Sequence, residues 1–399
     1  MYCTFPGLAT IVMSSPFENN DSFGFFGAPT YTKTPLGESI DKSTMKLLKV
    51  FFSMHSINLM ILLSLFNNGA GPNTKEEITR FLGGTDYQKW GVHTIRILNS
   101  ELNERFSQLN PEALTVANKV YVSDKFRLQD AFTSAARSYR SEVDTLDFSQ
   151  AQQAADVINQ WADEKTKGNI KKPVSPDVLG SDVAAALFNV IYFKGHWHVP
   201  FKSEETRDKD FHVSTSSVVQ KPTMHLLQSL FYTESAELGA RMVELPYKER
   251  GFRMVVVLPN EVDGLPSVLE KASEKGLLND VFKLSPAGTE VDLDIPKFDI
   301  KSKLDFNGIL PKLGVSKLFE EPAGGIVQGQ SVVVSKAFQE AFIKVDEEGA
   351  TAGAFTGFVT MAISINSRPP TPMKFTVDRP FLYLIVFEDI ILFAGTYQH

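Results

Sequence analysis

The segment from Gly349 to Ser367, "GATAGAFTGFVTMAISINS", carries no charge, although it lies near the C-terminal end of an acidic chain of 399 residues. An apolar run of about 20 residues is what a helix needs to cross a bilayer. Several hydroxyl side chains and glycines, together with β-branched residues, disfavour a membrane helix here. We therefore expect no membrane partner and keep a membrane-inserting segment as an alternative.

An extended conformation suits the same segment better. With a period of two, one face of a strand carries mostly small side chains, namely Ala350, Ala352, Ala354, Thr356 and Phe358. Small residues on one face let a segment enter between neighbouring strands without displacing packed side chains. The flanks agree, because Glu347, Glu348 and Gly349 form a polar hinge and "SRPPTP" forms a stiff extended exit.

Composition and charge exclude several classes of function. The hydrophobic content of 43% and charged content of 22% are those of an ordinary globular protein. A net charge of -7, without a dense Lys/Arg run, argues against nucleic acid, heparin or an anionic membrane as partner. The single cysteine, Cys3, excludes an intrachain disulfide and a thiolate metal cluster.

Motifs of enzyme chemistry are missing from the sequence. It has no nucleophile elbow, no phosphate-binding glycine loop and no His-Glu-x-x-His helix. His196 and His198 could supply half of a metal site, but no third ligand is identifiable. We therefore predict no enzyme activity, no cofactor and no metal site.

The ends of the chain differ from its body. Residues 1–16 contain an apolar run followed by small residues, which is typical of a signal peptide, although the positive leader is missing. Residues 17–36 are rich in Asn, Ser, Gly and Pro and predict a flexible N-terminal arm. Residues 37–399 contain no linker and predict a single domain. We therefore expect a secreted, extracellular protein.

Helical patterns crowd the first half of that domain and strand patterns the second. Residues 43–71 predict a helix, a short break and a buried helix. A further helix is expected over 149–168, with Ser149 as its N-cap and Gly168 at its end. Regular βαβ alternation is absent, so the sequence predicts an α+β fold.

Several motifs, taken in order, resemble those of one protein family. "KVDEEGATAGAFTG" (344–357) resembles the hinge of the reactive-centre loop of a serpin. "ANKVYVS", "INQWADEKTKGNI", "NVIYFKGHWHVPF", "VELPY", "MVVVLPNE", "DIPKFDI", "FTVDRPFLYLIV" and "LFAGTY" also resemble serpin signatures, in serpin order. The resemblance covers roughly residues 40–397. It implies about nine helices around three β-sheets, with an exposed reactive-centre loop at about 347–373.

The resemblance also implies a mechanism. A serpin offers its loop to a target protease, is cleaved to a covalent acyl-enzyme, and inserts the freed hinge side into its central sheet as a new strand. Such a protein is a metastable monomer that inhibits by suicide trapping and is not a turnover enzyme. The alternative within the family is a non-inhibitory serpin that acts as a substrate, carrier, storage or chaperone-type protein.

The family pattern places the cut bond about fourteen residues beyond the hinge glycine, so that the inserted strand spans roughly 45 Å. Counting from Gly349, this implies the bond between Ile363 and Ser364. An apolar Ile suits elastase-like or chymotrypsin-like pockets, and papain-like cysteine proteases stay open. The loop is longer than is typical, so a bond within 358–362 or beyond Ser364 remains an alternative. Arg368 is followed by Pro369, which disfavours cleavage there.

The resemblance assigns two further sets of residues. The implied hinge comprises Glu347, Glu348, Gly349, Ala350, Ala352, Ala354 and Thr356. The polar cluster beneath the sheet, called the shutter, would comprise Ser53, Ser56, Asn189 and Gln339. Gln339 stands where the family has a histidine, and it can still donate and accept hydrogen bonds. Trp197 is expected in the breach, at the top of the sheet where insertion begins.

Overall fold

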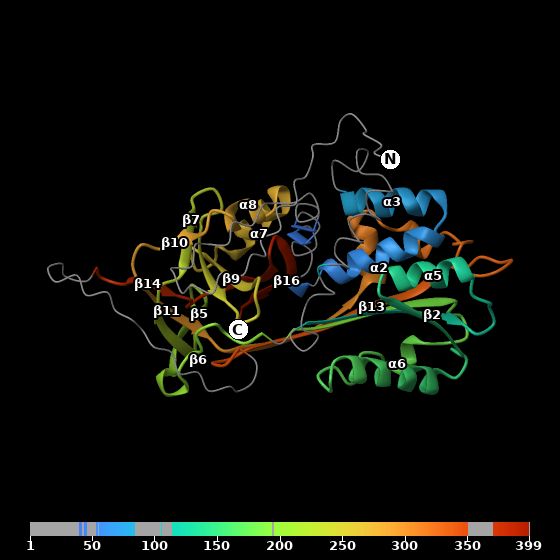
Figure 1. Cartoon of the computed structure of the whole chain (residues 1–399), viewed down its shortest axis with the longest axis horizontal. Helices are drawn as coiled ribbons and strands as arrows, with labels where there is room; N and C mark the ends of the chain where they lie inside the picture. Colours follow the sequence, from blue (N-terminus) through green and yellow to red (C-terminus); the bar gives the residue numbers. More distant parts are fainter. Residues whose placement is uncertain are drawn as a thin grey trace, which may run out of the picture. The chain divides into compact units, whose positions relative to one another are not determined.

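The computed structural model describes residues 40–41, 44–45, 53–54, 56–83, 105, 114–193, 195–349 and 370–398 (Figure 1). The expected signal peptide over 1–16 and arm over 17–36 lie outside these ranges, as does the segment 350–367 considered as a membrane span. No helix among the described residues is long and apolar enough to cross a bilayer.

A five-stranded sheet forms the part of the fold that matters most for function. Its strand order is β12-β13-β4-β2-β3. The strands are β2 (Leu114–Ser123), β3 (Ser141–Leu146), β4 (Ala185–Phe193), β12 (Phe298–Asp305) and β13 (Val334–Val345). Pairing is antiparallel for β12 with β13 and for β4 with β2, and parallel for β13 with β4 and for β2 with β3.

Both faces of this sheet are covered, which explains why β4 is apolar at nearly every position. All nine residues of β4 are buried, as is typical of a strand with helices or core on both sides. On one face, Ile158 of α6 (Ala151–Lys165) belongs to the same buried cluster as Phe188 and Val190 of β4. On the other face, α2 (Ser56–Gly69) contacts β4 and β2 (Figure 1).

Two other sheets complete the strand content of the described residues. The seven-stranded sheet contains β1 (Ser53–Met54), β16 (Ile390–Tyr397), β15 (Phe381–Phe387), β9 (Phe252–Pro259), β8 (Ala240–Pro246), β7 (Phe231–Ser235) and β10 (Ser285–Pro286). The four-stranded sheet contains β14 (Met373–Thr376), β11 (Val291–Pro296), β6 (Ser217–Gln228) and β5 (Arg207–Ser214). The predicted three sheets and α+β class are confirmed.

Seven α-helices are defined within the described ranges, against about nine expected. Besides α2 and α6 they are α3 (Pro72–Gly83), α5 (Asp130–Ser138), α7 (Leu265–Lys275), α8 (Leu278–Val281) and α9 (Phe306–Ile309). Short 3₁₀ helices occupy Pro176–Val178, Ser203–Glu205, Leu310–Leu313 and Lys317–Phe319.

The predicted N-cap of α6 is wrong. The helix begins at Ala151, and the flanking Gln150 makes no side-chain cap. Ser149 instead donates from its backbone N–H and its hydroxyl to Asp147 Oδ1, at 2.9 and 2.6 Å. The Ser149 hydroxyl is thus hydrogen-bonded to a neighbouring carboxylate and does not cap the helix. At the other end, Gly168 has φ +85° and donates to the Asp163 carbonyl at 2.9 Å, close to the predicted stop.

Packing of α6 on the five-stranded sheet gives the first prediction. Ile158 is fully buried between α6 and β4, whereas its neighbour Val157 is 45% exposed. Ile158→Ala should lower the free energy of unfolding by about 2–4 kcal/mol, through lost burial and the cavity left behind. Val157→Ala is the matched control and should change it by less than about 0.5 kcal/mol. Urea unfolding followed by fluorescence measures both, and equal effects would contradict the packing described.

Candidate functional site

The parallel contact between β13 and β4 runs along the middle of the five-stranded sheet, and we call it the seam. Its register runs from Val334 opposite Ala185 to Phe342 opposite Tyr192, with a shift of one residue between Val334 and Lys336. Above that level β13 continues to Val345, which pairs with Phe298 of β12 on its other side. Parallel pairing is slightly less stable per residue than antiparallel pairing. The seam is the parallel pairing nearest the centre of the sheet, and its paired register ends three residues before β13 does.

A tight turn follows β13 at this open end. Gly349 N–H donates to the carbonyl of Asp346 at 3.2 Å, and Gly349 has φ +90°. A Cβ at this position would lie 2.5 Å from the Gly195 carbonyl oxygen and 2.6 Å from the Trp197 backbone nitrogen. Only glycine fits, because the backbone is left-handed and its neighbours approach too closely for a side chain. Residues 346–349 thus form a built turn, which we call the hinge turn.

Trp197 attaches the hinge turn to the top of the seam. Its indole Nε1–H donates to the Asp346 carbonyl at 2.8 Å, and its backbone N–H donates to the Glu348 carbonyl at 3.3 Å. The ring stacks on Tyr247, with centroids 4.5 Å apart and planes 11° apart. The structure therefore puts Trp197 at the open end of the seam, where it holds the hinge turn through both backbone and side chain.

Contacts of a charged side chain, Glu347, also hold the hinge turn at the open end of the seam. The carboxylate of Glu347 accepts a hydrogen bond from Thr206 Oγ1 at 2.7 Å and pairs with Lys297 Nζ at 2.7 Å. Its backbone carbonyl accepts from the Phe201 N–H at 2.9 Å. Burial alone would raise the pKa of Glu347, but the bonds from Lys297 and Thr206 outweigh it and lower that pKa. We call Glu347, Thr206 and Lys297 the hinge latch.

A row of buried amides crosses the sheet at mid-height. Asn189 of β4 lies opposite Asn118 of β2 on one side and opposite Gln339 of β13 on the other. Asn189 Nδ2 donates to Asn118 Oδ1 at 2.6 Å. Of the expected shutter, Ser53 lies in β1 opposite Gly395 and Ser56 begins α2, and their side chains lie outside the described residues.

Three residues of the site were missed by sequence reasoning. Asn118 had a signal, because it is a polar residue inside the apolar strand pattern "TVANKVYVS". Nothing in the sequence marked Thr206 or Lys297. Thr206, for example, lies 141 residues from Glu347 in the sequence and contacts it only in the folded structure. The expected hinge residues Ala350, Ala352, Ala354 and Thr356 and the bond Ile363–Ser364 lie outside the described residues.

His196, considered as half of a metal site, is used otherwise. Its Nδ1 lies 3.0 Å from Glu249 Oε1, and its backbone N–H donates to Glu249 Oε2 at 3.1 Å. Within the part of the chain that the structure describes, no cluster of three or more His, Cys, Asp or Glu is arranged to hold a metal ion.

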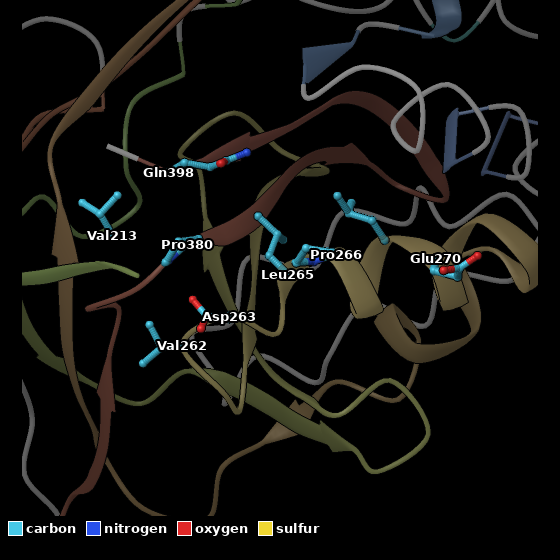
Figure 2. Close-up of a pocket in the computed structure, with 9 residues that line it drawn as sticks. Val213, Val262, Asp263, Leu265, Pro266, Glu270, Pro380 and Gln398 are labelled. Carbon is cyan, nitrogen blue, oxygen red and sulfur yellow. The ribbon is translucent and has the colours of Figure 1, made fainter. Parts of the chain in front are cut away.

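A cavity of about 390 Å³ lies elsewhere, between the start of α7 and the ends of β15 and β16 (Figure 2). Its lining is mostly apolar and comprises Val213, Val262, Asp263, Leu265, Pro266, Leu269, Glu270, Pro380 and Gln398. None of these residues belongs to the seam, the hinge turn or the hinge latch. We assign it no part in the candidate site.

Comparison with known proteins decides the family. A family model described as Serpin (serine protease inhibitor) matches residues 40–399. The chain belongs to the serpin family. An antitrypsin from Bombyx mori is 35% identical over 339 residues, covering 84% of each chain. Antichymotrypsin-2 from the same organism is 34% identical over 339 residues, covering 84% of this chain and 88% of the relative.

A solved serpin structure agrees with the fold. Serpin48 from the insect Tenebrio molitor, described as a highly specific serpin, superposes with a TM-score of 0.77 at 33% identity, covering 92% of this chain and 97% of that one. In this serpin, then, the candidate site consists of the seam, the hinge turn held by Trp197, the hinge latch and the amide row.

The hinge latch predicts a position-specific effect of charge reversal. Glu347→Lys would place two ammonium groups together at a site where the carboxylate is only 10% exposed. We expect the free energy of unfolding to fall by about 2–4 kcal/mol, from two lost charge-assisted hydrogen bonds and the new repulsion. Glu348→Lys, at the exposed neighbouring position, is the control and should change it by less than about 0.5 kcal/mol. Similar losses in the two variants, measured in urea, would count against the latch.

The lowered pKa of Glu347 also predicts a pH dependence. Its ionised form stabilises the folded state above the ordinary value of 4.5, and this contribution is lost as the pH falls through the lowered folded-state pKa. Glu347→Gln should therefore cost about 1–2 kcal/mol near neutral pH, and the gap between wild type and variant should shrink on acidification below that value. Paired melting curves across this range measure it, and a gap independent of pH would contradict the assignment.

Proposed function

We propose that this serpin inhibits an endopeptidase of apolar preference by covalent suicide trapping. The nucleophile of a serine protease, or of a papain-like cysteine protease, attacks the carbonyl carbon of Ile363. The bond to the Ser364 nitrogen breaks, the nucleophile's proton passes to that amine, and the protease stays attached to Ile363 as an acyl-enzyme. The segment before the cut then enters the seam as a new strand, and the chain does not act as a turnover enzyme.

The observation that carries the proposal is the hinge turn at the open end of a parallel seam. Asp346 and Gly349 close the turn, so the chain beyond it would return antiparallel to β13, with Ala350 opposite Val345 and Met361 opposite Val334. A strand between β4 and β13 would be antiparallel to both. One parallel pairing would thus be replaced by two antiparallel pairings, which are the more stable kind.

The length of the segment after the hinge turn also supports insertion between β4 and β13. The twelve residues of β13 match the twelve residues from Ala350 to Met361. Ile363 follows just beyond the far end, so the acyl-linked residue would be carried roughly 45 Å from the hinge turn. A dozen new hydrogen bonds at about 0.5–1.5 kcal/mol each, together with apolar burial, would stabilise the inserted form. After the conformational entropy lost in ordering the loop is subtracted, roughly 10 kcal/mol would remain.

The alternation of side chains along the segment also matches the two faces of the five-stranded sheet. The expected inward face of the segment, from Ala350 to Phe358, would share the core side of the sheet with Val345, Ile343, Ala341, Gln339 and Ala337. In this register Thr356 falls between Gln339 and Asn189, so its hydroxyl would join the amide row. A polar side chain thus meets the polar level of the sheet, where it can be hydrogen-bonded.

The target class is proposed from the sequence and from the relatives. Those named antitrypsin and antichymotrypsin support protease inhibition in general, and their names point to different specificities. Ile363 favours a protease with an apolar primary pocket. A net charge of -7 suits a protein without a heparin site. We also propose secretion, with residues 1–16 as signal peptide, and action as a monomer built from one domain over 37–399.

A panel of elastase-like, chymotrypsin-like, trypsin-like and papain-like proteases tests the function. We expect one apolar-directed enzyme to form a complex that survives denaturant, with mass spectrometry locating the cut before Ser364. Clipped protein should melt about 10–15 °C higher than the intact chain, as roughly 10 kcal/mol of added stability implies for a domain of this size. A clipped chain with an unchanged melting temperature and no complex would favour the non-inhibitory alternative.

A substitution on the inward face of the segment from Ala350 to Phe358 tests whether trapping can be lost while cleavage is kept. Thr356→Arg would force a guanidinium into the buried amide row, at a cost of several kcal/mol. We expect cleavage at the same bond, while the yield of stable complex falls at least tenfold. Thr351→Arg, on the opposite face near the solvated Lys344, is the control and should lower the yield less than threefold. Equal yields for the two variants, read by gel densitometry, would count against insertion in this orientation.

A further inference from the structure

The cavity at the start of α7 is built from segments that lie far apart in the sequence (Figure 2). Val213 lies in β5, residues 262–270 belong to α7 and the loop before it, Pro380 precedes β15, and Gln398 follows β16. Pro380 and Gln398 lie next to the same cross-strand pair of β15 and β16. These segments meet only in the folded chain. We call this cavity of about 390 Å³ the α7 cavity.

The α7 cavity has the size and the mostly apolar lining of a small-molecule site. Six of its nine lining residues are apolar. The two least exposed of them, Leu265 and Leu269, are only 3% and 6% exposed and lie one turn apart on the same face of α7. Small-molecule sites in proteins usually enclose about 300–1,000 Å³ and combine an apolar lining with a few polar groups. The cavity therefore suits the apolar body of a small ligand.

The charges at the α7 cavity are all of one sign. Of the described residues that line it, the charged ones are Asp263 and Glu270, and both are acidic. In Figure 2, Asp263 lies between Val262, Pro380 and Leu265, whereas Glu270 lies farther along α7. Within the part of the chain that the structure describes, the Asp263 carboxylate forms no hydrogen bond and no ion pair. This carboxylate can therefore accept a hydrogen bond from a cation.

The basic side chains next to the lining residues in the sequence are engaged elsewhere. Arg379 donates from Nε to the Asp378 carboxylate at 2.8 Å and from Nη1 to the Asn260 carbonyl at 2.6 Å. Lys271 Nζ donates to a backbone carbonyl at 3.4 Å. No aromatic ring is among the nine lining residues, so an aromatic cage cannot hold a cation here. A cation at this cavity must be held by Asp263 through its own N–H groups.

We propose that the α7 cavity binds a small molecule with an apolar body and a protonated amine. The amine donates to the Asp263 carboxylate, and the body lies on Leu265 and Leu269. Hydrogen bonds between an ammonium group and a carboxylate are stronger than those between neutral groups. A ligand with an anionic head would instead meet two negative charges. This binding site is separate from the seam, the hinge turn and the hinge latch, and it does not depend on the proposed inhibition of a protease.

Three ligands that share one apolar body test the proposal on the full chain at pH 7. They are 4-phenylbutylamine, 4-phenylbutanol and 4-phenylbutyrate, which differ in the charge of the head group. We expect the amine to bind about fivefold more tightly than the alcohol, because an ion pair with an exposed carboxylate contributes an effect of this size. The alcohol should bind about fivefold more tightly than the carboxylate. Isothermal titration calorimetry measures all three, and equal affinities for amine and alcohol, or no binding of any ligand, would overturn the proposal.

A melting experiment follows from the same proposal. A ligand that binds only the folded chain raises the melting temperature as its concentration rises. The α7 cavity exists only when its segments are assembled, so 4-phenylbutylamine should raise the melting temperature more than equal concentrations of the alcohol. A melting temperature that responds identically to both ligands would contradict the proposed role of the carboxylate.

Two substitutions separate Asp263 from the general negative charge of the protein. Asp263→Asn should weaken binding of the amine about fivefold, to the affinity of the alcohol, and should change binding of the alcohol by less than twofold. Glu261→Gln removes an exposed carboxylate two residues away that does not line the cavity, and it is the matched control. It should change binding of both ligands by less than twofold. Equal losses of amine affinity in the two variants would overturn the assignment of Asp263.

Nuclear magnetic resonance locates the bound ligand directly. In protein with labelled valine and leucine methyl groups, the phenyl ring of 4-phenylbutylamine should show contacts to Val262, Leu265 and Leu269. Val157 and Leu227, which are 45% and 46% exposed and lie outside the lining, are the controls for unspecific apolar binding. They should show no contacts. Contacts of equal strength at the control methyl groups would overturn the α7 cavity as the binding site.

Discussion

The parallel pairing of β4 with β13 is the constraint on which the rest of the site depends. Every residue of β4 is buried, and its backbone groups are paired with β2 on one side and β13 on the other. The sheet is thus complete as it stands, yet its central pairing is of the less stable kind. The proposed insertion would replace this parallel pairing by two antiparallel pairings and so release free energy.

Contacts at the top of the seam and along its face oppose that gain. The hinge latch and the Trp197 contacts hold the hinge turn in place just beyond the end of β13 at Val345. Two stacked aromatic pairs, Phe188 with Phe338 and Tyr192 with Phe342, cross the seam. These interactions are local, whereas the free energy gained in the proposed insertion would be spread along a whole strand. A barrier of local contacts before a distributed gain is what a metastable state requires.

Sequence reasoning found the parts of this arrangement that leave a local or a family pattern. The helix end near Gly168 followed from a local pattern, whereas the expected roles of Trp197 and Asn189 came from the resemblance to serpins. The N-cap at Ser149 failed because the helix begins only at Ala151, and the Ser149 hydroxyl donates instead to Asp147, two residues away. Lys297, Thr206 and the pairing of Phe188 with Phe338 left no signal, because each depends on which distant strands become neighbours and in what register.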